Sequence, residues 1–389
     1  MYRLVSRTRP ATWMALLCTC LLLYLSACST GPAQPSQTNA TPTQQATSDM
    51  AGTTPQATTN GIGLQVPGHY ATPTTTPKST TATPAAQTAP VDRPVLAFYY
   101  MWYHQTDWSL SKMSDLPNNQ YISSDDATVD RQVTMASNAG ITGFISSWWG
   151  PGDQTDQNFV KLLAHSATLQ NRTYAHFAST VYFECDAPGL NTIGNIVTGL
   201  RYLSSHYANN PNFFHWQGKP VLFFWKPLDN GRTLAQWAAI RSQVDPNNQM
   251  IWSAEGVDTT LLDVFDGIHL FSAGYWGLLS NTMTAVDQGF RTKVDTYNKA
   301  NGTHKIWAAG VEPGYNDTHV AGRVGTYIVP RNNGATYATS WTAAMASQPE
   351  WITITSFNEW FEGAMIEPSV TYGNQYLSLT QQFAREWHG

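Results

Sequence analysis

The chain has 389 residues, of which only 12% are charged, and its 21 Lys and Arg against 26 Asp and Glu give a net charge of −5. Because this balance provides no basic surface to hold a polyphosphate backbone, it argues against nucleic acid as a partner. Aromatic residues also make up 12%, with 15 Trp and 18 Tyr, and their rings suit flat, hydroxyl-rich ligands, although core packing accounts for most of them.

The first 28 residues have the pattern of a secretory signal. MYRLVSRTRP carries three arginines and no acid, and an apolar run from Ala15 to Leu25 leads into LSAC at residues 25–28. The run is too short for a membrane span, which needs about 20 apolar residues. LSAC resembles the bacterial lipobox, which assigns lipidation to Cys28. We therefore predict an exported protein, anchored by its N-terminal lipid to the outer side of the bacterial cell membrane, or secreted if the signal is cleaved in the ordinary way.

Residues 29–92 are predicted to form a disordered tether rich in Thr, Pro and Gln. Only Asp49 and Lys78 are charged between residues 29 and 91, and no periodic apolar pattern offers a core. A flexible chain of this length separates its ends by about 45 Å. Cys185 is the one cysteine beyond residue 28, so stability must come from a large core and not from a disulfide framework.

Residues 93–389 show a regular alternation of apolar strand-like runs and helical patterns. The strand-like runs are 95–100, 141–146, 174–183, 220–225, 250–254, 267–271, 305–311 and 351–357. Helical patterns cover 126–139, 157–170, 233–244, 285–300, 335–346 and 376–387, whereas only a short DTTLLDVFD segment separates the fifth and sixth strands. This alternation predicts a (β/α)8 TIM barrel. A doubly wound sheet is the alternative, but no GxGxxG loop follows the first strand.

Five glutamates follow predicted strands, at the end of a barrel where active sites lie. Glu184 follows the third strand, Glu255 the fifth, Glu312 the seventh, and Glu359 and Glu362 the eighth. For any single one of them, a buried ion pair or a helix cap is an equally good interpretation. Together, in a chain poor in charge, they indicate an active site.

The stretch ITSFNEWFEG places Glu359 and Glu362 three positions apart in the turn that leaves the eighth strand. Close carboxylates push their pKa values apart, so that one is protonated and one is ionised near neutral pH. Cleavage of a glycosidic bond requires this combination of groups. Tryptophans, on which sugar rings stack, lie between the two glutamates and beside other strand ends: Trp360, Trp102, Trp148, Trp149, Trp225, Trp276 and Trp307.

The residues also resemble a known family. SFNEWFEGAMIEPS at 356–369 resembles the SFNEWHEGTQIEPA signature of glycoside hydrolase family 99, the endo-α-mannosidase and endo-α-mannanase family. AFYYMWY at 97–103, AGITGFISSWWG at 139–150 and VEPGYNDT at 311–318 are similar to its first, second and seventh strand regions. The resemblance spans most of residues 93–389, with the motifs in the family's order.

The resemblance implies a retaining, endo-acting α-glycosidase on a barrel, with no metal and no organic cofactor. It implies that Glu359 deprotonates the 2-hydroxyl of the sugar, which forms a 1,2-anhydro sugar, and that Glu362 is the general acid and then the general base. It also implies substrate contacts for Glu184, Tyr315 and Asn316. We further predict substrate contacts for Asn358 and for the aromatic residues Tyr100, Trp102, Trp149, Trp225, Trp276 and Trp360.

The sequence departs from the family signature beside the glutamate pair. Phe361 replaces the usual histidine, and Ala364 and Met365 replace Thr-Gln. Each change removes a hydrogen-bonding group, and lost hydrogen bonds to a sugar change specificity strongly. An α-mannan is therefore the first expectation for the substrate, with another α-glycan such as a glucan or a heteropolysaccharide as an alternative.

Other chemistries have little support in the sequence. No HExxH or CxxC motif indicates a metal site, and no GxSxG motif indicates a serine hydrolase. Two functions remain: a surface-anchored, monomeric glycosidase that cuts a polysaccharide or oligosaccharide, or a lipoprotein that binds glycans without cutting them. The presence of both glutamates favours the enzyme.

Overall fold

The computed structural model describes residues 92–389 except Tyr174. The predicted signal segment, the lipidated Cys28 and the tether up to residue 91 lie outside the described residues. Within the described part, no helix combines the length and the apolar character needed to cross a membrane.

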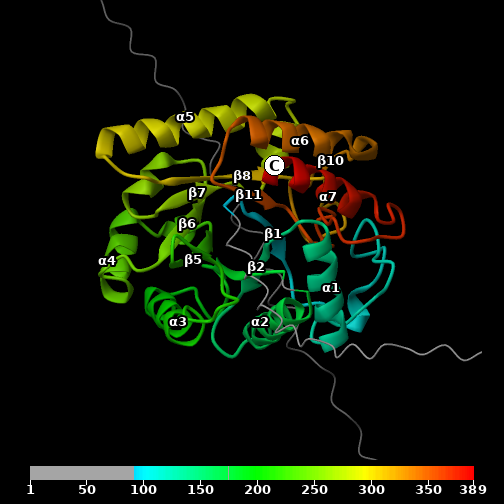
Figure 1. Cartoon of the computed structure of the whole chain (residues 1–389), viewed down its shortest axis with the longest axis horizontal. Coiled ribbons are helices and arrows are strands. Elements are labelled where there is room, and N and C mark those ends of the chain that lie inside the picture. The colour runs from blue at the N-terminus through cyan, green and yellow to red at the C-terminus, as the bar shows by residue number, and fades with distance from the viewer. Residues whose placement is uncertain (1–91, 174) are drawn as a thin grey trace, which may run out of the picture. The chain divides into compact units, whose positions relative to one another are not determined.

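Eight parallel strands form a closed barrel (Figure 1). They are β1 (Val95–Tyr99), β2 (Gly143–Trp148), β3 (Thr180–Glu184), β5 (Lys219–Trp225), β6 (Ile251–Glu255), β7 (Gly267–His269), β8 (Ile306–Val311) and β11 (Trp351–Ile354). The strands pair in chain order, β3 pairs directly with β5, and β1 pairs with β11 to close the ring. The predicted (β/α)8 fold class is confirmed.

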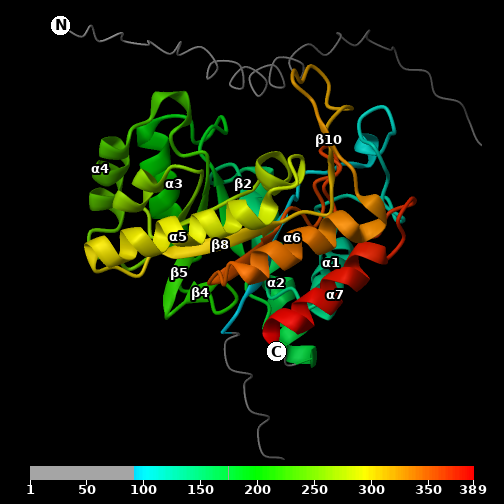
Figure 2. The same cartoon turned by 90° about the horizontal axis from the view of Figure 1, so that it is seen from above.

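Seven α-helices of the described chain surround the barrel (Figure 2). They are α1 (Asp126–Asn138), α2 (Gln154–Thr173), α3 (Ile193–His206), α4 (Leu234–Val244), α5 (Met283–Asn301), α6 (Ala335–Ala346) and α7 (Gln375–His388). The connection from β6 to β7 carries only the 3₁₀ helix η3 (Thr259–Asp263). The segment between the fifth and sixth predicted strands is thus too short to form an α-helix, but it still connects one barrel strand to the next.

Two sequence predictions differ from the structure in detail. The third strand begins at Thr180 and not at residue 174, and Ser179 before it makes only an isolated bridge to Phe213. Helix α3 was not predicted, because Gly194 and Gly199 weaken its helical pattern. A Cβ at Gly199 would lie 2.9 Å from Leu190 Cδ2 and 3.3 Å from ring atoms of Phe183 and Trp148, so this glycine allows the helix to pack closely on the barrel.

Two short pairs of strands complete the sheet structure. β4 (His215–Trp216) runs antiparallel to the start of β5. β9 (Tyr315–Asn316) and β10 (Ile328–Val329) form an antiparallel hairpin that follows β8. The hairpin projects from the edge of the molecule that is uppermost in Figure 2, near the loop that precedes α5.

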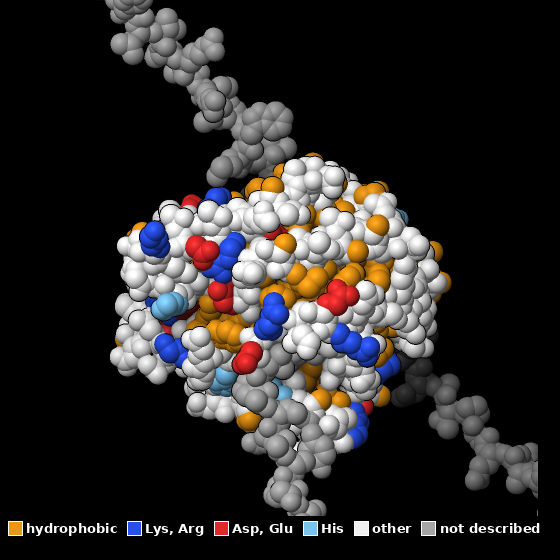
Figure 3. All heavy atoms as spheres, turned by 45° about the horizontal axis from the view of Figure 1, so that its top comes forward, with side chains coloured by type: hydrophobic (Ala, Val, Ile, Leu, Met, Phe, Trp, Pro, Cys, Tyr) orange, Lys and Arg blue, Asp and Glu red, His pale blue; other side chains and the backbone are white. Residues whose placement is uncertain are grey.

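The core has two layers that follow the alternation of side chains along the strands. In β1, Leu96 and Phe98 belong to the cluster inside the barrel, whereas Val95, Ala97 and Tyr99 pack in the cluster between the barrel and the helices. On the face shown in Figure 3, charged side chains are scattered among apolar and neutral ones. Because both layers of the core are packed, the barrel is a rigid base for the loops at the strand ends.

Candidate active site

The structure places all five predicted glutamates at the carboxyl ends of barrel strands. Glu184 and Glu255 are the last residues of β3 and β6, Glu312 directly follows β8, and Glu359 and Glu362 lie in the loop after β11. Burial is the main cause that raises the pKa of Glu184 and of Glu312 to about 8 and that of Glu255 to about 7. The rim therefore holds a group of carboxyls that keep protons more readily than exposed glutamates do.

The loop after β11 is fixed by buried hydrogen bonds to β1. Phe357 N donates to Phe98 O over 2.8 Å. The Asn358 side chain accepts from Tyr100 N and donates to Tyr100 O, both over 2.8 Å, and also donates to Tyr121 Oη over 3.2 Å. These bonds position the main chain that carries Glu359 and Glu362. They use the amide of Asn358 for structure, and its predicted contact with substrate stays a prediction.

Trp360 lies between the two glutamates in sequence but is completely buried. Its Nε1 donates to Glu367 Oε2 over 3.1 Å, and its backbone N donates to Tyr103 Oη over 2.9 Å. The same Glu367 accepts from Tyr121 Oη and Gln132 Nε2. In this conformation Trp360 packs and anchors the loop, which favours a structural role over a contact with substrate.

Glu359 is only 4% exposed. Burial and the negative charge of Glu362 raise its pKa well above the usual range, and the charge of Arg323 opposes this rise. Its backbone N donates to Ser356 Oγ over 2.6 Å. Burial therefore favours the neutral form of Glu359 in this position.

Glu362 has the opposite partner, a cation. Arg323 Nη1 donates to Glu362 Oε1 over 2.7 Å, to Tyr315 Oη over 2.9 Å and to Asp317 Oδ2 over 3.1 Å. The short contact between Arg323 and Glu362 has the geometry of a charge-assisted hydrogen bond. Sequence reasoning missed Arg323, whose only signal is its place six residues after Asp317 in the loop that leaves the seventh predicted strand.

A chain of hydrogen bonds connects Glu184 to the aromatic side of the site. Trp149 Nε1 donates to Ser147 Oγ over 3.1 Å, and Ser147 Oγ donates to Glu184 Oε1 over 2.8 Å. The ring of Trp102 lies 5.7 Å from that of Trp149 and 4.7 Å from that of Tyr100. Trp102 and Trp149 are partly exposed, so they offer apolar surface at the ends of β1 and β2.

The other tryptophans noted beside strand ends divide by exposure, and of these Trp225 and Trp276 are predicted substrate contacts. Trp225 is partly exposed at the end of β5, with the Lys226 amine 4.7 Å from its ring, and Trp276 is 41% exposed. Trp148 and Trp307 are completely buried and pack in the core between barrel and helices. Only the first two are accessible to a ligand in this conformation.

Tyr315 and Asn316 lie in the hairpin, directly beside Glu362. Tyr315 is buried and its hydroxyl accepts from Arg323. Asn316 N donates to Glu362 O over 2.8 Å, and its side-chain oxygen accepts from Thr318. In their observed positions both residues support Glu362 and its loop.

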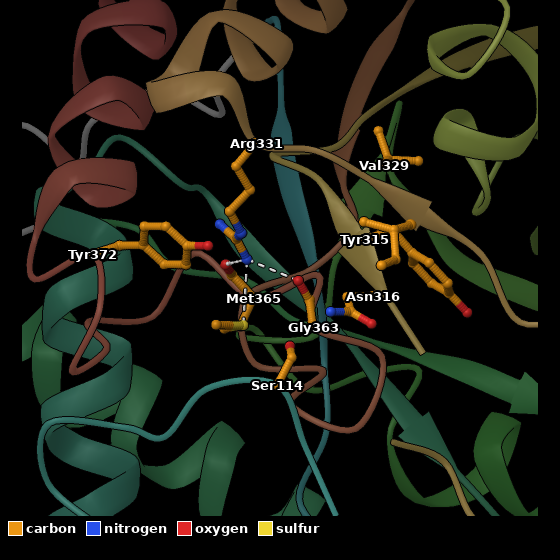
Figure 4. A pocket seen from close by; sticks show the side chains of 9 residues that line it. Ser114, Tyr315, Asn316, Val329, Arg331, Gly363, Met365 and Tyr372 are labelled. Carbon is orange, nitrogen blue, oxygen red and sulfur yellow. Dashed lines mark hydrogen bonds between the residues drawn. The ribbon is translucent and has the colours of Figure 1, made fainter. Parts of the chain in front are cut away.

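A small cavity of about 130 Å³ lies against the main chain that follows Glu362 (Figure 4). Arg331 points into this region, where its Nη2 donates to the carbonyl oxygens of Gly363 and Met365. Met365 is 1% exposed and Ala364 is completely buried. These two departures from the family signature therefore pack against the hairpin and Arg331, and not against open solvent. Phe361 is half-buried, with its ring 5.4 Å from that of Tyr103.

Residues 92–389, apart from Tyr174, contain no group of three or more His, Cys, Asp or Glu side chains arranged to hold a metal ion. Cys185 is a free, buried cysteine.

A closed (β/α)8 barrel with two carboxyls in unlike surroundings after its last strand has the architecture of a glycoside hydrolase. Residues 104–382 match the model of glycosyl hydrolase family 99, and because this match covers more than half of the chain, the protein belongs to that family.

Known relatives agree with this assignment. The chain is 24% identical over 291 residues to the rat glycoprotein endo-alpha-1,2-mannosidase, covering 69% of this chain and 61% of the rat protein. It is 26% identical over 308 residues to the enzyme of that name from Xenopus laevis, covering 69% of this chain and 64% of the frog protein. The chain thus spans less than two thirds of the length of these relatives.

Solved structures support the fold. The GH99 endo-alpha-mannosidase from Bacteroides thetaiotaomicron superposes with a TM-score of 0.63 at 22% identity, covering 77% of this chain and 98% of that structure.

Proposed function

We propose that this protein is a retaining, endo-acting α-glycosidase that cuts an α-linked polysaccharide, with an α-mannan as the first candidate. The observation that carries the proposal is the unlike environment of two neighbouring carboxyls: Glu359 is buried with a raised pKa, and Glu362 is paired with Arg323. The names of the rat and frog relatives, endo-alpha-1,2-mannosidases, support α-mannose as the sugar.

The proposed mechanism uses the substrate's own 2-hydroxyl as the nucleophile. Glu359 takes the proton of this hydroxyl, whose oxygen attacks the anomeric carbon, while Glu362 gives a proton to the departing glycosidic oxygen. A 1,2-anhydro sugar results. Glu362 then takes a proton from water, the water oxygen opens the anhydro ring at the anomeric carbon, and Glu359 returns its proton to O2. Two inversions at the anomeric carbon give overall retention.

The resting protonation differs from the one that this mechanism needs at its start. Burial favours the protonated form of Glu359, and Arg323 donates a hydrogen bond to Glu362. For Glu359 to act as the base, it must lose that proton once the glycan is bound.

Substitution of Glu362 by glutamine tests the proposal. We expect Glu362→Gln to lower the rate of glycan cleavage by at least about 100-fold, because general acid and base catalysis supplies a factor of this size. The measurement is product length by mass spectrometry, with a panel of α-mannans and α-glucans as substrates. Product configuration by NMR gives the stereochemistry, for which we expect retention.

Glu386→Gln, which changes an exposed glutamate in α7, is the matched control and should cleave at the wild-type rate. Equal rates in wild type and Glu362→Gln would remove Glu362 from the mechanism. Glycan binding without any product, unchanged in Glu362→Gln, would instead indicate a binding lipoprotein.

We also propose that the enzyme works outside the cell at the membrane surface. The signal pattern of residues 1–28, the lipobox ending at Cys28 and the Thr- and Pro-rich stretch of residues 29–92 support this location. A catalytic domain on a long tether would reach a polymer too large to enter the cell.

A further inference from the structure

Exposed apolar side chains are concentrated at one place on the described surface. Five of the eight large apolar side chains with the highest exposure, Tyr275, Trp276, Leu279, Val324 and Ile328, come from two loops. The first loop contains the π-helix η4 (Gly274–Leu278), which follows β7, and the second is the β9–β10 hairpin. The two loops are neighbours, since the rings of Tyr275 and Tyr327 lie 5.8 Å apart, and exposed apolar side chains grouped in this way often mark an interaction site.

Four aromatic rings connect this patch to the glutamate pair. Tyr315 contacts Arg323, the partner of Glu362, and its ring stacks on Tyr327 with centroids 4.4 Å apart. Tyr327 lies 5.8 Å from Tyr275, which lies 5.4 Å from Trp276. The inner two rings are less exposed than the outer two: Tyr315 is buried and Tyr327 half-buried, whereas Tyr275 is 51% and Trp276 41% exposed. We call these four residues the aromatic track.

The backbone holds the outer rings of the track in place. A Cβ on Gly274 would lie 2.7 Å from Glu312 Oε2, and one on Gly277 would lie 2.6 Å from the sulfur of Met283. The glycines on both sides of Tyr275 and Trp276 thus pack tightly against the protein, and Gly274 N donates to the Glu312 carboxylate. Rings that are exposed on a fixed backbone lose little conformational freedom when a ligand binds.

The arginine at the inner end of the track is already paired with acids. Arg323, which donates to Tyr315, also pairs with Asp317 and Glu362. It is therefore engaged and does not offer a free partner to a uronate or a phosphate group, whereas the faces of a neutral sugar stack on tyrosine and tryptophan.

We propose that the exposed rings of Tyr275 and Trp276, at the outer end of the aromatic track, bind further pyranose rings of a neutral glycan chain whose cleaved bond lies at Glu359 and Glu362. This inference rests on the proposed function and assigns to the site an extended binding surface on the hairpin side. It makes the enzyme depend on chain length, because only a chain that reaches Tyr275 and Trp276 gains the additional contacts.

Calorimetric titration of the full-length chain tests this inference. All proteins carry Glu362→Gln to prevent cleavage, and the probes are a disaccharide and an octasaccharide of α-1,2-linked mannose. We expect the preference for the octasaccharide over the disaccharide to fall by about tenfold in Tyr275→Ala/Trp276→Ala, since aromatic anchors carry contributions of this order. Tyr275→Phe/Trp276→Phe, which keeps both rings, should retain most of it. Val160→Ala, at an exposed apolar residue of α2, is the surface control.

The outcomes separate this inference from the proposed function. If the alanine variant keeps the wild-type preference for the octasaccharide, the proposed glycan binding by the track is wrong, even if the wild type cleaves mannan. A reduced preference supports the track, even if the wild type proves unable to cleave. Absence of binding to both oligosaccharides overturns it, and binding of polygalacturonate as tightly as the octasaccharide overturns the neutral class of ligand.

Discussion

Glu359 and Glu362 are separated by two residues, yet the fold gives them opposite surroundings. Glu359 is turned into the protein, where burial and Glu362 raise its pKa, whereas Glu362 faces the hairpin and its cation Arg323. The contrast depends on the turn after β11. The side chain of Asn358 holds this turn by two hydrogen bonds to the backbone of Tyr100. Two identical side chains thus acquire different tasks from position alone.

Arg323 is the residue through which this contrast can be tested. It lowers the pKa of Glu359, so Arg323→Ala should raise that pKa further. If Glu359 acts as a base, the acidic limb of the pH–rate profile should move to higher pH. The measurement is kcat/KM for glycan cleavage from pH 4 to pH 9.

Two further variants separate this effect from a general loss of structure. Arg323→Lys keeps the charge and should restore most of the wild-type profile. Arg172→Ala removes an arginine of α2 that pairs with Asp130 and should leave the profile unchanged. A profile of Arg323→Ala that coincides with the wild type would show that Arg323 does not act on the base.

At the scale of elements, α5 contains a buried acid that the proposed chemistry does not use. Asp287 is completely buried, and no described residue donates a hydrogen bond to either of its carboxylate oxygens. Burial raises its pKa from 3.8 to about 8. Between these values the folded state binds one proton more than the unfolded state, so this group reduces stability as the pH rises.

Asp287→Asn should therefore stabilise the protein more at pH 7 than at pH 5. The difference in unfolding free energy between variant and wild type should grow by about 2.5 kcal/mol over this range. Urea denaturation at both pH values measures it. Asp295→Asn, at an exposed position of the same helix, should show a much smaller change. A constant difference for Asp287→Asn would mean that Asp287 is ionised at both pH values.

The strands and the five rim glutamates were predictable from the sequence because they depend on local patterns. Buried parallel strands appear as continuous apolar runs, and residues directly after them must lie at one end of the barrel. Arg323, the outer residue Tyr275 and the anchoring role of Asn358 depend on contacts between distant segments. Arg323 and Glu362 are 39 positions apart in the sequence, and Asn358 and Tyr100 are 258 positions apart. No local sequence pattern predicts contacts over such separations.

For the whole molecule, the proposed function gives the barrel and the N-terminal segment separate tasks. The described residues form a closed barrel with its own core, and the candidate site lies on the strand ends and loops of that barrel. Residues 1–92 contribute no predicted catalytic or substrate-binding residue. Location and chemistry should therefore be separable by mutation.

Cys28→Ala provides this separation. If Cys28 carries the lipid, the variant expressed in a bacterium should leave the membrane fraction and lose labelling by radioactive palmitate, while released protein keeps the wild-type specific activity on glycans. Cys185→Ala is the matched control, because Cys185 is buried in the barrel and should not affect location. Retention of Cys28→Ala in the membrane with its label intact would show that the lipid is attached elsewhere. Retention without label would indicate that the apolar run from Ala15 to Leu25 stays uncleaved as the anchor.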